Sequence, residues 1–194
     1  GDLFTGKLTV TYNIDAPADM VFEDIAPRLW DVTGDGLPEV VVVQSHQSKG
    51  ARLAIIGLVE GQLEYLAATP HIGTRFRWLA PVGAADFNGD GYIDVAFVDR
   101  PHLAKTLRVW SYAPGVFEQS GSLRGLSNHR IGEDFISGGV RDCGDGPEMV
   151  LADAGWQNVM VARLSKTSFT ANPVRRFEGP QSFADVLACK DSAG

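Results

Sequence analysis

The residues of this sequence that could do chemistry are acidic, and they recur in three glycine-rich loops. The loops and the residues after them read DVTGDGLPEVVVV (31–43), DFNGDGYIDVAFV (86–98) and DCGDGPEMVLA (142–152), and their first aspartates lie 55 and then 56 residues apart. Side-chain oxygens gathered in one short loop are the ligands that a hard cation such as Ca²⁺ prefers. The alternative is an Asp-Gly turn whose aspartates accept hydrogen bonds from neighbouring amides and bind no metal.

Apolar segments flank each loop and define the elements that must position it. A short apolar segment leads into each loop (26–30, 81–85, 137–141), a continuous apolar run follows (40–43, 95–98, 149–152), and an alternating segment comes next (52–58, 107–112, 158–164). Continuous apolarity predicts strands that are covered on both faces, whereas alternation is typical of a half-exposed strand. A further strand follows a glycine-containing turn, so each unit predicts four antiparallel strands, as in a propeller blade.

The two complete loops carry a resemblance to a known family. Asp31–Glu39 and Asp86–Asp94, each followed by β-branched or aromatic residues, resemble FG-GAP/VCBS repeats, the calcium-loop blades of integrin α-subunit propellers and of many bacterial secreted proteins. The resemblance covers most of the chain and implies an all-β, small β-propeller. It says little about function, because one scaffold of this kind serves unrelated tasks.

The repeat predicts a single domain, 1–194, with three full four-stranded blades at about 22–76, 77–132 and 133–180. A strand-like segment remains at each end, 6–14 and 183–189, and FADVLAC (183–189) aligns with SGGVRDC (137–143). We therefore expect 1–21 and 181–194 to join in a shortened fourth blade, which would hide the sheet edges. The alternative is a fragment of a larger ring whose other blades are supplied elsewhere.

In each complete loop, positions 1, 3, 5 and 9 offer side-chain oxygens and position 7 offers its backbone carbonyl. Ca²⁺ takes such ligands, and glycine at position 6 permits the sharp turn, so we expect one or two calcium sites. The predicted ligands are Asp31, Thr33, Asp35, Leu37 and Glu39 in the first loop, and Asp86, Asn88, Asp90, Tyr92 and Asp94 in the second. The second loop is the better predicted site, since the amide oxygen of Asn88 is a stronger donor than the hydroxyl of Thr33.

The third loop is shorter than the other two by two residues. It keeps Asp142, Asp145 and Glu148 but lacks the ligand at position 3. We expect this loop to bind no cation.

The repeat alignment places Cys143 and Cys189 at equivalent positions of neighbouring blades, which predicts a disulfide. Such a bridge would stabilise the fold by about 4 kcal/mol in the chain-entropy model. The alternative is two buried free thiols.

A disulfide indicates an oxidising compartment, so we expect a secreted or periplasmic protein. The chain begins at Gly1 rather than Met, and we expect any signal peptide to have been removed.

The loops of the opposite face carry all four histidines. Guanidinium groups there could hold an anion and indoles could stack on a sugar, which predicts a ligand site at the mouth of the central channel. The candidate residues are His71, Arg77, Trp78, His129, Arg130, Glu133 and Asp134. The alternative is a solvated polar surface with Arg–Glu pairs bridging the blades.

The composition and the motifs exclude several classes of function. A net charge of −7 argues against nucleic-acid binding, and no apolar run approaches the length of a membrane helix. The sequence contains no catalytic motif. We therefore expect an exported, calcium-stabilised, non-enzymatic binding or adhesion module, monomeric, with a protein or carbohydrate ligand. Two alternatives remain: a polysaccharide hydrolase or lyase with Glu133 or Asp134 as the acid, and a structural domain of a larger assembly.

Overall fold

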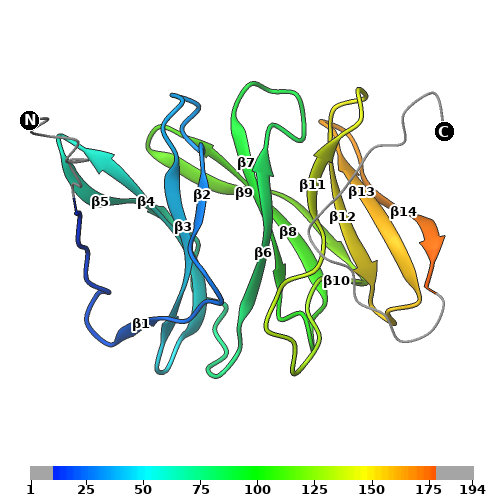
Figure 1. The fold of residues 1–194 in the computed structure, drawn as a ribbon, viewed down its shortest axis with the longest axis horizontal. Helices are drawn as coiled ribbons and strands as arrows, with labels where there is room; N and C mark the ends of the chain where they lie inside the picture. Colours follow the sequence, from blue (N-terminus) through cyan, green and yellow to red (C-terminus); the bar gives the residue numbers. More distant parts are fainter. Residues whose placement is uncertain (1–10, 178–194) are drawn as a thin grey trace, which may run out of the picture.

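The computed structural model describes residues 11–177, which form fourteen β-strands and no helix (Figure 1). The predicted all-β class is therefore confirmed. Within this range, no helix has the length and apolarity that crossing a membrane requires. The strands make three antiparallel sheets that stand next to one another in chain order, and we call them sheets 1, 2 and 3.

Each sheet is a meander of adjacent strands. Sheet 1 contains β1 (Met20–Phe22), β2 (Arg28–Trp30), β3 (Glu39–His46), β4 (Gly50–Val59) and β5 (Gln62–Ala68). Sheet 2 contains β6 (Leu79–Ala85), β7 (Ile93–Asp99), β8 (Thr106–Ala113) and β9 (Val116–Arg124). Sheet 3 contains β10 (Leu126–Ser127), β11 (Gly139–Asp142), β12 (Pro147–Asp153), β13 (Asn158–Leu164) and β14 (Phe169–Arg176).

The first strand is continuous only in sheet 2. In sheet 1, β1 and β2 both pair with β3, and residues 23–27 lie between them. In sheet 3, β10 and β11 both pair with β12, and residues 128–138 lie between them. Sheets 1 and 3 thus follow the same four-strand plan as sheet 2, except that an insertion interrupts the first strand of each.

The core lies between neighbouring sheets. One apolar cluster joins sheets 1 and 2 and includes Leu53, Ile55 and Phe97, and a second joins sheets 2 and 3 and includes Leu107 and Met149. The continuous apolar runs that follow the acidic loops supply much of both clusters and are buried except for Val40, which is half-buried. Burial on both faces accounts for the lack of alternation in these runs.

The predicted closing blade falls largely outside the described residues, which exclude residues 6–10, the segment 183–189 and Cys189. Residues 11–14, from the predicted first segment, form no strand. Side chains rather than a strand ladder hold the chain here to sheet 1. Ile14 packs against buried residues of β3 and β4, and the carbonyl of Asp15 accepts a hydrogen bond from the Tyr65 hydroxyl at 2.9 Å.

Candidate binding and metal sites

Both complete acidic loops fold around their first aspartate. Asp86 Oδ1 accepts hydrogen bonds from the backbone amides of Gly89 (2.7 Å) and Asp90 (3.1 Å), and Oδ2 accepts one from Gly91 (2.9 Å). Asp31 accepts the three corresponding bonds in the first loop at 2.8–3.1 Å. The loops therefore hold their shape through local amide–carboxylate bonds, while the Oδ2 atom of each carboxylate, which accepts one bond, can take about one further partner.

The second loop carries two groups that a cation would stabilise. Asn88 Oδ1, at position 3, is buried and has no hydrogen-bond partner among the described residues. Asp94, at position 9, is fully buried, and burial raises the pKa of its carboxyl to about 6. A buried polar atom normally has a partner, so an unpartnered oxygen here matches the donor set of a calcium loop.

In the first loop, the side chains at positions 3 and 9 already form hydrogen bonds within the loop. Glu39 Oε2 accepts hydrogen bonds from the amides of Val32 (2.7 Å) and Thr33 (3.0 Å), and the Thr33 hydroxyl donates to Glu39 Oε1 at 3.3 Å. Across residues 11–177, no three acidic, histidine or cysteine side chains gather closely enough to hold a metal ion. Of the two complete loops, the second fits Ca²⁺ better, because its position-3 oxygen lacks a partner.

In the third loop, guanidinium groups lie beside the last carboxylate. Glu148 is 2% exposed and forms ion pairs with Arg141, at 2.7 Å from Nε to Oε1, and with Arg163. Asp142 Oδ1 accepts hydrogen bonds from the amides of Gly144 and Gly146. Two positive side chains thus neutralise the buried Glu148, and the expectation that this loop binds no cation stays a prediction.

The acidic loops lie at one end of the sheets, and the β3–β4 hairpin and the β5–β6 connection lie at the other (Figure 1). Two histidine pairs form at the end opposite the acidic loops: the rings of His46 and His71 lie 5.5 Å apart, and His102 Nε2 lies 2.9 Å from His129 Nδ1. His129 Nε2 is 3.1 Å from the carbonyl of Glu133 and must donate to it. His129 Nδ1 and His102 Nε2 share the hydrogen bond between the two rings, in which one nitrogen donates and the other accepts.

The structure divides the candidate ligand residues among three cavities. Trp78, His129 and Glu133 line a cavity of about 280 Å³, which we call the acidic cavity because Glu23 and Asp24 complete most of its wall. The Trp78 indole Nε1 donates to the carbonyl of Glu23 at 2.7 Å. Three carboxyl-bearing residues line this cavity, which does not suit the anionic ligand that the sequence predicted.

Two of the candidates lie on the other cavities. Asp134 lines the inner cavity, a space of about 420 Å³ bounded by Ile25, Arg28, Trp30, Pro81, Val82, Asp134, Phe135, Ile136, Gly138 and Gly139. His71 lines the seam cavity, a space of about 230 Å³ bounded by Thr69, Pro70, His71, Ile72, Phe97, Asp99, Arg100, Arg108, Trp110 and Gln119.

The two predicted arginines lie outside all three cavities. The guanidinium of Arg130 lies 4.3 Å from the centre of the Trp156 ring, which is a cation–π contact. Arg77 is exposed, and its Nη1 donates to the carbonyl of Phe76. Neither arginine reaches the cavities that the other candidates line.

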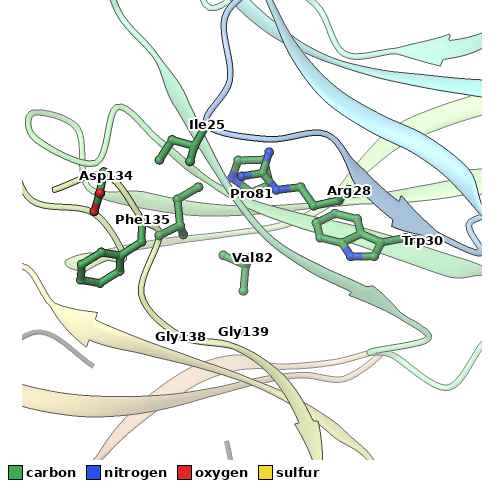
Figure 2. Close-up of a pocket in the computed structure, with 10 residues that line it drawn as sticks. Ile25, Arg28, Trp30, Pro81, Val82, Asp134, Phe135, Gly138 and Gly139 are labelled. Carbon is green, nitrogen blue, oxygen red and sulfur yellow. The ribbon is translucent and has the colours of Figure 1, made fainter. Parts of the chain in front are cut away.

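The inner cavity is built where the two insertions meet over β6. Figure 2 shows Arg28 and Trp30 on one side, Asp134 and Phe135 on the other, and Val82 between them. Sequence reasoning missed Trp30 and Phe135, because nothing in the repeat spacing shows that residues so far apart in the chain meet. The one available signal was the length of the segment between the second and third repeats, which indicates an insertion there.

Two backbone features bring these walls together. The register of β6 against β7 shifts between Pro81 and Gly83, so Val82 is the extra residue of a bulge. A Cβ atom at Gly83 would lie 2.3 Å from Val140 Cγ2, so only glycine lets β6 approach β11 this closely. On the opposite wall, Arg28 forms an ion pair with Asp24 that fixes its side chain across the first insertion.

Glu133 and Asp134, the predicted candidates for a catalytic acid, line different cavities. Glu133 Oε2 accepts a hydrogen bond from the Arg130 amide at 3.2 Å, within its own turn. The two carboxyl groups therefore do not form a pair across one site. Cys143 is disulfide-bonded, and its predicted partner Cys189 lies outside the described residues.

Comparison with known proteins gives one match. Residues 31–97 match the family of FG-GAP-like repeats, over a range that includes both complete acidic loops. No curated relative and no solved structure matches the chain. The chain thus carries an FG-GAP-like repeat at residues 31–97, in agreement with the resemblance that its acidic loops show.

Proposed function

We propose that this chain is a β-propeller-type, non-enzymatic binding module that takes its ligand in the inner cavity. The FG-GAP-like repeat and the three similar sheets support the scaffold. The observation that carries the ligand site is that two insertions, in sheets 1 and 3, converge over the bulge of β6 to enclose about 420 Å³. A volume of this size lies within the range of roughly 300–1,000 Å³ that small-molecule sites occupy.

The lining of the inner cavity favours a carbohydrate ligand. Trp30 and Phe135 supply aromatic surface, and Phe135 is 39% exposed. Arg28 and Asp134 add one group that donates and one that accepts hydrogen bonds. Aromatic faces against a sugar ring, with polar groups for its hydroxyls, form the mixed apolar and polar lining that is typical of binding pockets.

A glycan array followed by a variant pair tests this proposal. We expect the wild-type protein to bind a subset of glycans, and Phe135→Ala to weaken the best of them about tenfold because an aromatic contact is lost. Phe76→Ala is the matched control, since Phe76 is a second exposed aromatic, 78% exposed, that lines none of the three cavities. The affinity of the control should be unchanged.

Two outcomes would contradict the carbohydrate proposal. One is an array on which no glycan binds, and the other is an equal affinity for Phe135→Ala and the wild type. A reducing-end assay on the bound glycans separates binding from catalysis: we expect no turnover, and measurable turnover would favour the hydrolase or lyase alternative.

The second acidic loop supports a further part of the proposal, a structural calcium site. Asp86, Asn88, Asp90, the carbonyl of Tyr92 and Asp94 would hold the ion, which would draw together the three carboxylates that lie apart in this structure. The buried, unpartnered Oδ1 of Asn88 is the observation in favour. A bound Ca²⁺ would supply positive charge among these carboxylates and stiffen the loop. The disulfide at Cys143 supports an exported, oxidising location.

Calcium removal gives a direct measurement. Calcium at about 100 times its dissociation constant should raise the melting temperature by roughly 5–10 °C over the value in chelator, because ligand binding stabilises only the folded state. Asn88→Ala should abolish this difference, whereas Thr33→Ala, the equivalent change in the first loop, should keep most of it. A wild-type melting temperature that is the same in calcium and in chelator would refute the site.

A further inference from the structure

The seam cavity lies between sheets 1 and 2, away from the inner cavity and the acidic loops. Its walls come from the β5–β6 connection and from β7, β8 and β9. Two of its side chains are arginines and one is a buried aspartate, so positive and negative groups meet in its wall.

A single buried carboxylate holds both guanidinium groups. Asp99 is 1% exposed, and it accepts hydrogen bonds from Arg100 Nε (2.7 Å) and Nη2 (3.0 Å). Arg108 donates to the same carboxylate from Nε and Nη2, both at 3.0 Å, and donates from Nη1 to the Gln119 side chain at 2.8 Å. Two guanidinium groups therefore share one carboxylate, which leaves one positive charge in excess.

The backbone around Arg100 is fixed. Its φ of +47° is a left-handed conformation that a non-glycine residue rarely adopts. The Arg100 amide donates to the carbonyl of Trp78 at 3.1 Å, and the Arg100 carbonyl accepts from the amides of Leu103 and Lys105. The positive charge is thus preorganised, and a ligand would not have to order it.

One residue of the cavity wall also carries a hydrogen-bond donor without an acceptor. Trp110 lines it, and the indole Nε1 is buried with no hydrogen-bond partner within residues 11–177. A buried indole N–H usually finds an acceptor, and an unpaired buried donor carries a desolvation cost. An acceptor group in the cavity would remove that cost.

The remaining wall is apolar. Pro70, Ile72 and Phe97 line it, and the whole cavity measures about 230 Å³. An excess of one positive charge matches a monoanion, the free indole N–H matches an acceptor oxygen, and the apolar wall matches a short hydrocarbon body. We propose that the seam cavity binds a small organic carboxylate whose two oxygens face Arg100, Arg108 and the indole N–H of Trp110.

Calorimetric titration at pH 7 and low salt, with isobutyrate as the probe, tests this assignment. Arg100→Gln should weaken isobutyrate about tenfold or more, since a charged hydrogen-bond partner is lost while Asp99 keeps Arg108. Trp110→Phe removes only the N–H group and should weaken binding about fivefold. Trp156→Phe, on the β12–β13 connection outside the cavity, is the matched control and should bind like the wild type.

Spectroscopy and a neutral analogue complete the test. Isobutyrate should shift the indole ¹H–¹⁵N resonance that is missing from Trp110→Phe, and isobutyramide should not bind. Equal affinity for the amide, an unchanged affinity in Arg100→Gln, or saturable binding that leaves the Trp110 resonance unmoved would each overturn the proposal. Tighter binding of phosphate or sulfate than of isobutyrate would overturn the choice of a carboxylate.

Discussion

Gly50→Ala should lower the free energy of unfolding by about 3 kcal/mol, the sum of a left-handed backbone penalty and an overpacking penalty. Gly50 has a φ of +80°, and a Cβ atom there would lie 2.2 Å from the Thr74 carbonyl oxygen. That oxygen belongs to the backbone of the β5–β6 connection, so it cannot turn away as a flexible side chain could. Urea unfolding followed by fluorescence measures the loss.

The chain offers a close control for this substitution. Gly61 has the same φ of +80°, but no atom beyond its chain neighbours lies within 4 Å of the Cβ position. Gly61→Ala should therefore cost only the conformational penalty, about 1 kcal/mol. Equal losses for the two variants would show that contact with Thr74 contributes nothing to the effect.

The Gly50 contact also bears on the seam cavity. The amides of Ile72 and Gly73 donate to the carbonyls of Ala51 and Lys49, both at 2.9 Å, and so tie the β5–β6 connection to the β3–β4 hairpin. His71 Nδ1 lies 2.8 Å from the Gly50 carbonyl and donates to it. A displaced Gly50 would therefore move His71, and we expect the hairpin and one wall of the cavity to loosen together.

Asp99→Asn should cost about 2–3 kcal/mol, the second large effect. Asparagine keeps the shape of the side chain but removes the charge that two guanidinium groups share, and hydrogen bonding to that carboxylate raises the pKa of Arg100. The loss should stay below that of a fully buried pair, because the side chains of Arg100 and Arg108 remain 24% and 31% exposed. Urea unfolding at pH 7 provides the measurement.

Arg100→Gln is the comparison for Asp99→Asn. This variant leaves Asp99 paired with Arg108, so it should cost only about 1 kcal/mol. If Asp99→Asn were no more destabilising than Arg100→Gln, the carboxylate would not be the shared partner that fixes both arginines.

Local interactions made the acidic loops predictable from sequence. The hydrogen bonds that shape the first loop join Asp31 to amides three to five residues later, and the second loop repeats them from Asp86. Strand periodicity depends on which face is buried, and it likewise located the apolar runs that form the core. The prediction that the third loop binds no cation likewise rests on the sequence alone, because a ligand position is missing there.

Contacts between segments far apart in the chain decided the surroundings of the third loop and the placement of the candidate ligand residues. In the third loop, Arg163 on β13 pairs with Glu148 on β12 only because those strands are neighbours in the sheet. The sequence predicts that the seven candidate ligand residues share one face, whereas the structure places them on three cavities and in two separate arginine contacts.

The sequence by itself determined the repeat, the strands and the residues that fix the conformation of the acidic loops. Each of these depends on neighbours within a few positions along the chain. Only the tertiary structure decided where ligands can bind. The inner cavity requires two insertions to meet over a bulge in β6, and the seam cavity requires β8 and β9 to pack beside the β5–β6 connection. Such long-range contacts depend on how whole sheets pack against one another, and no local sequence pattern specifies that packing.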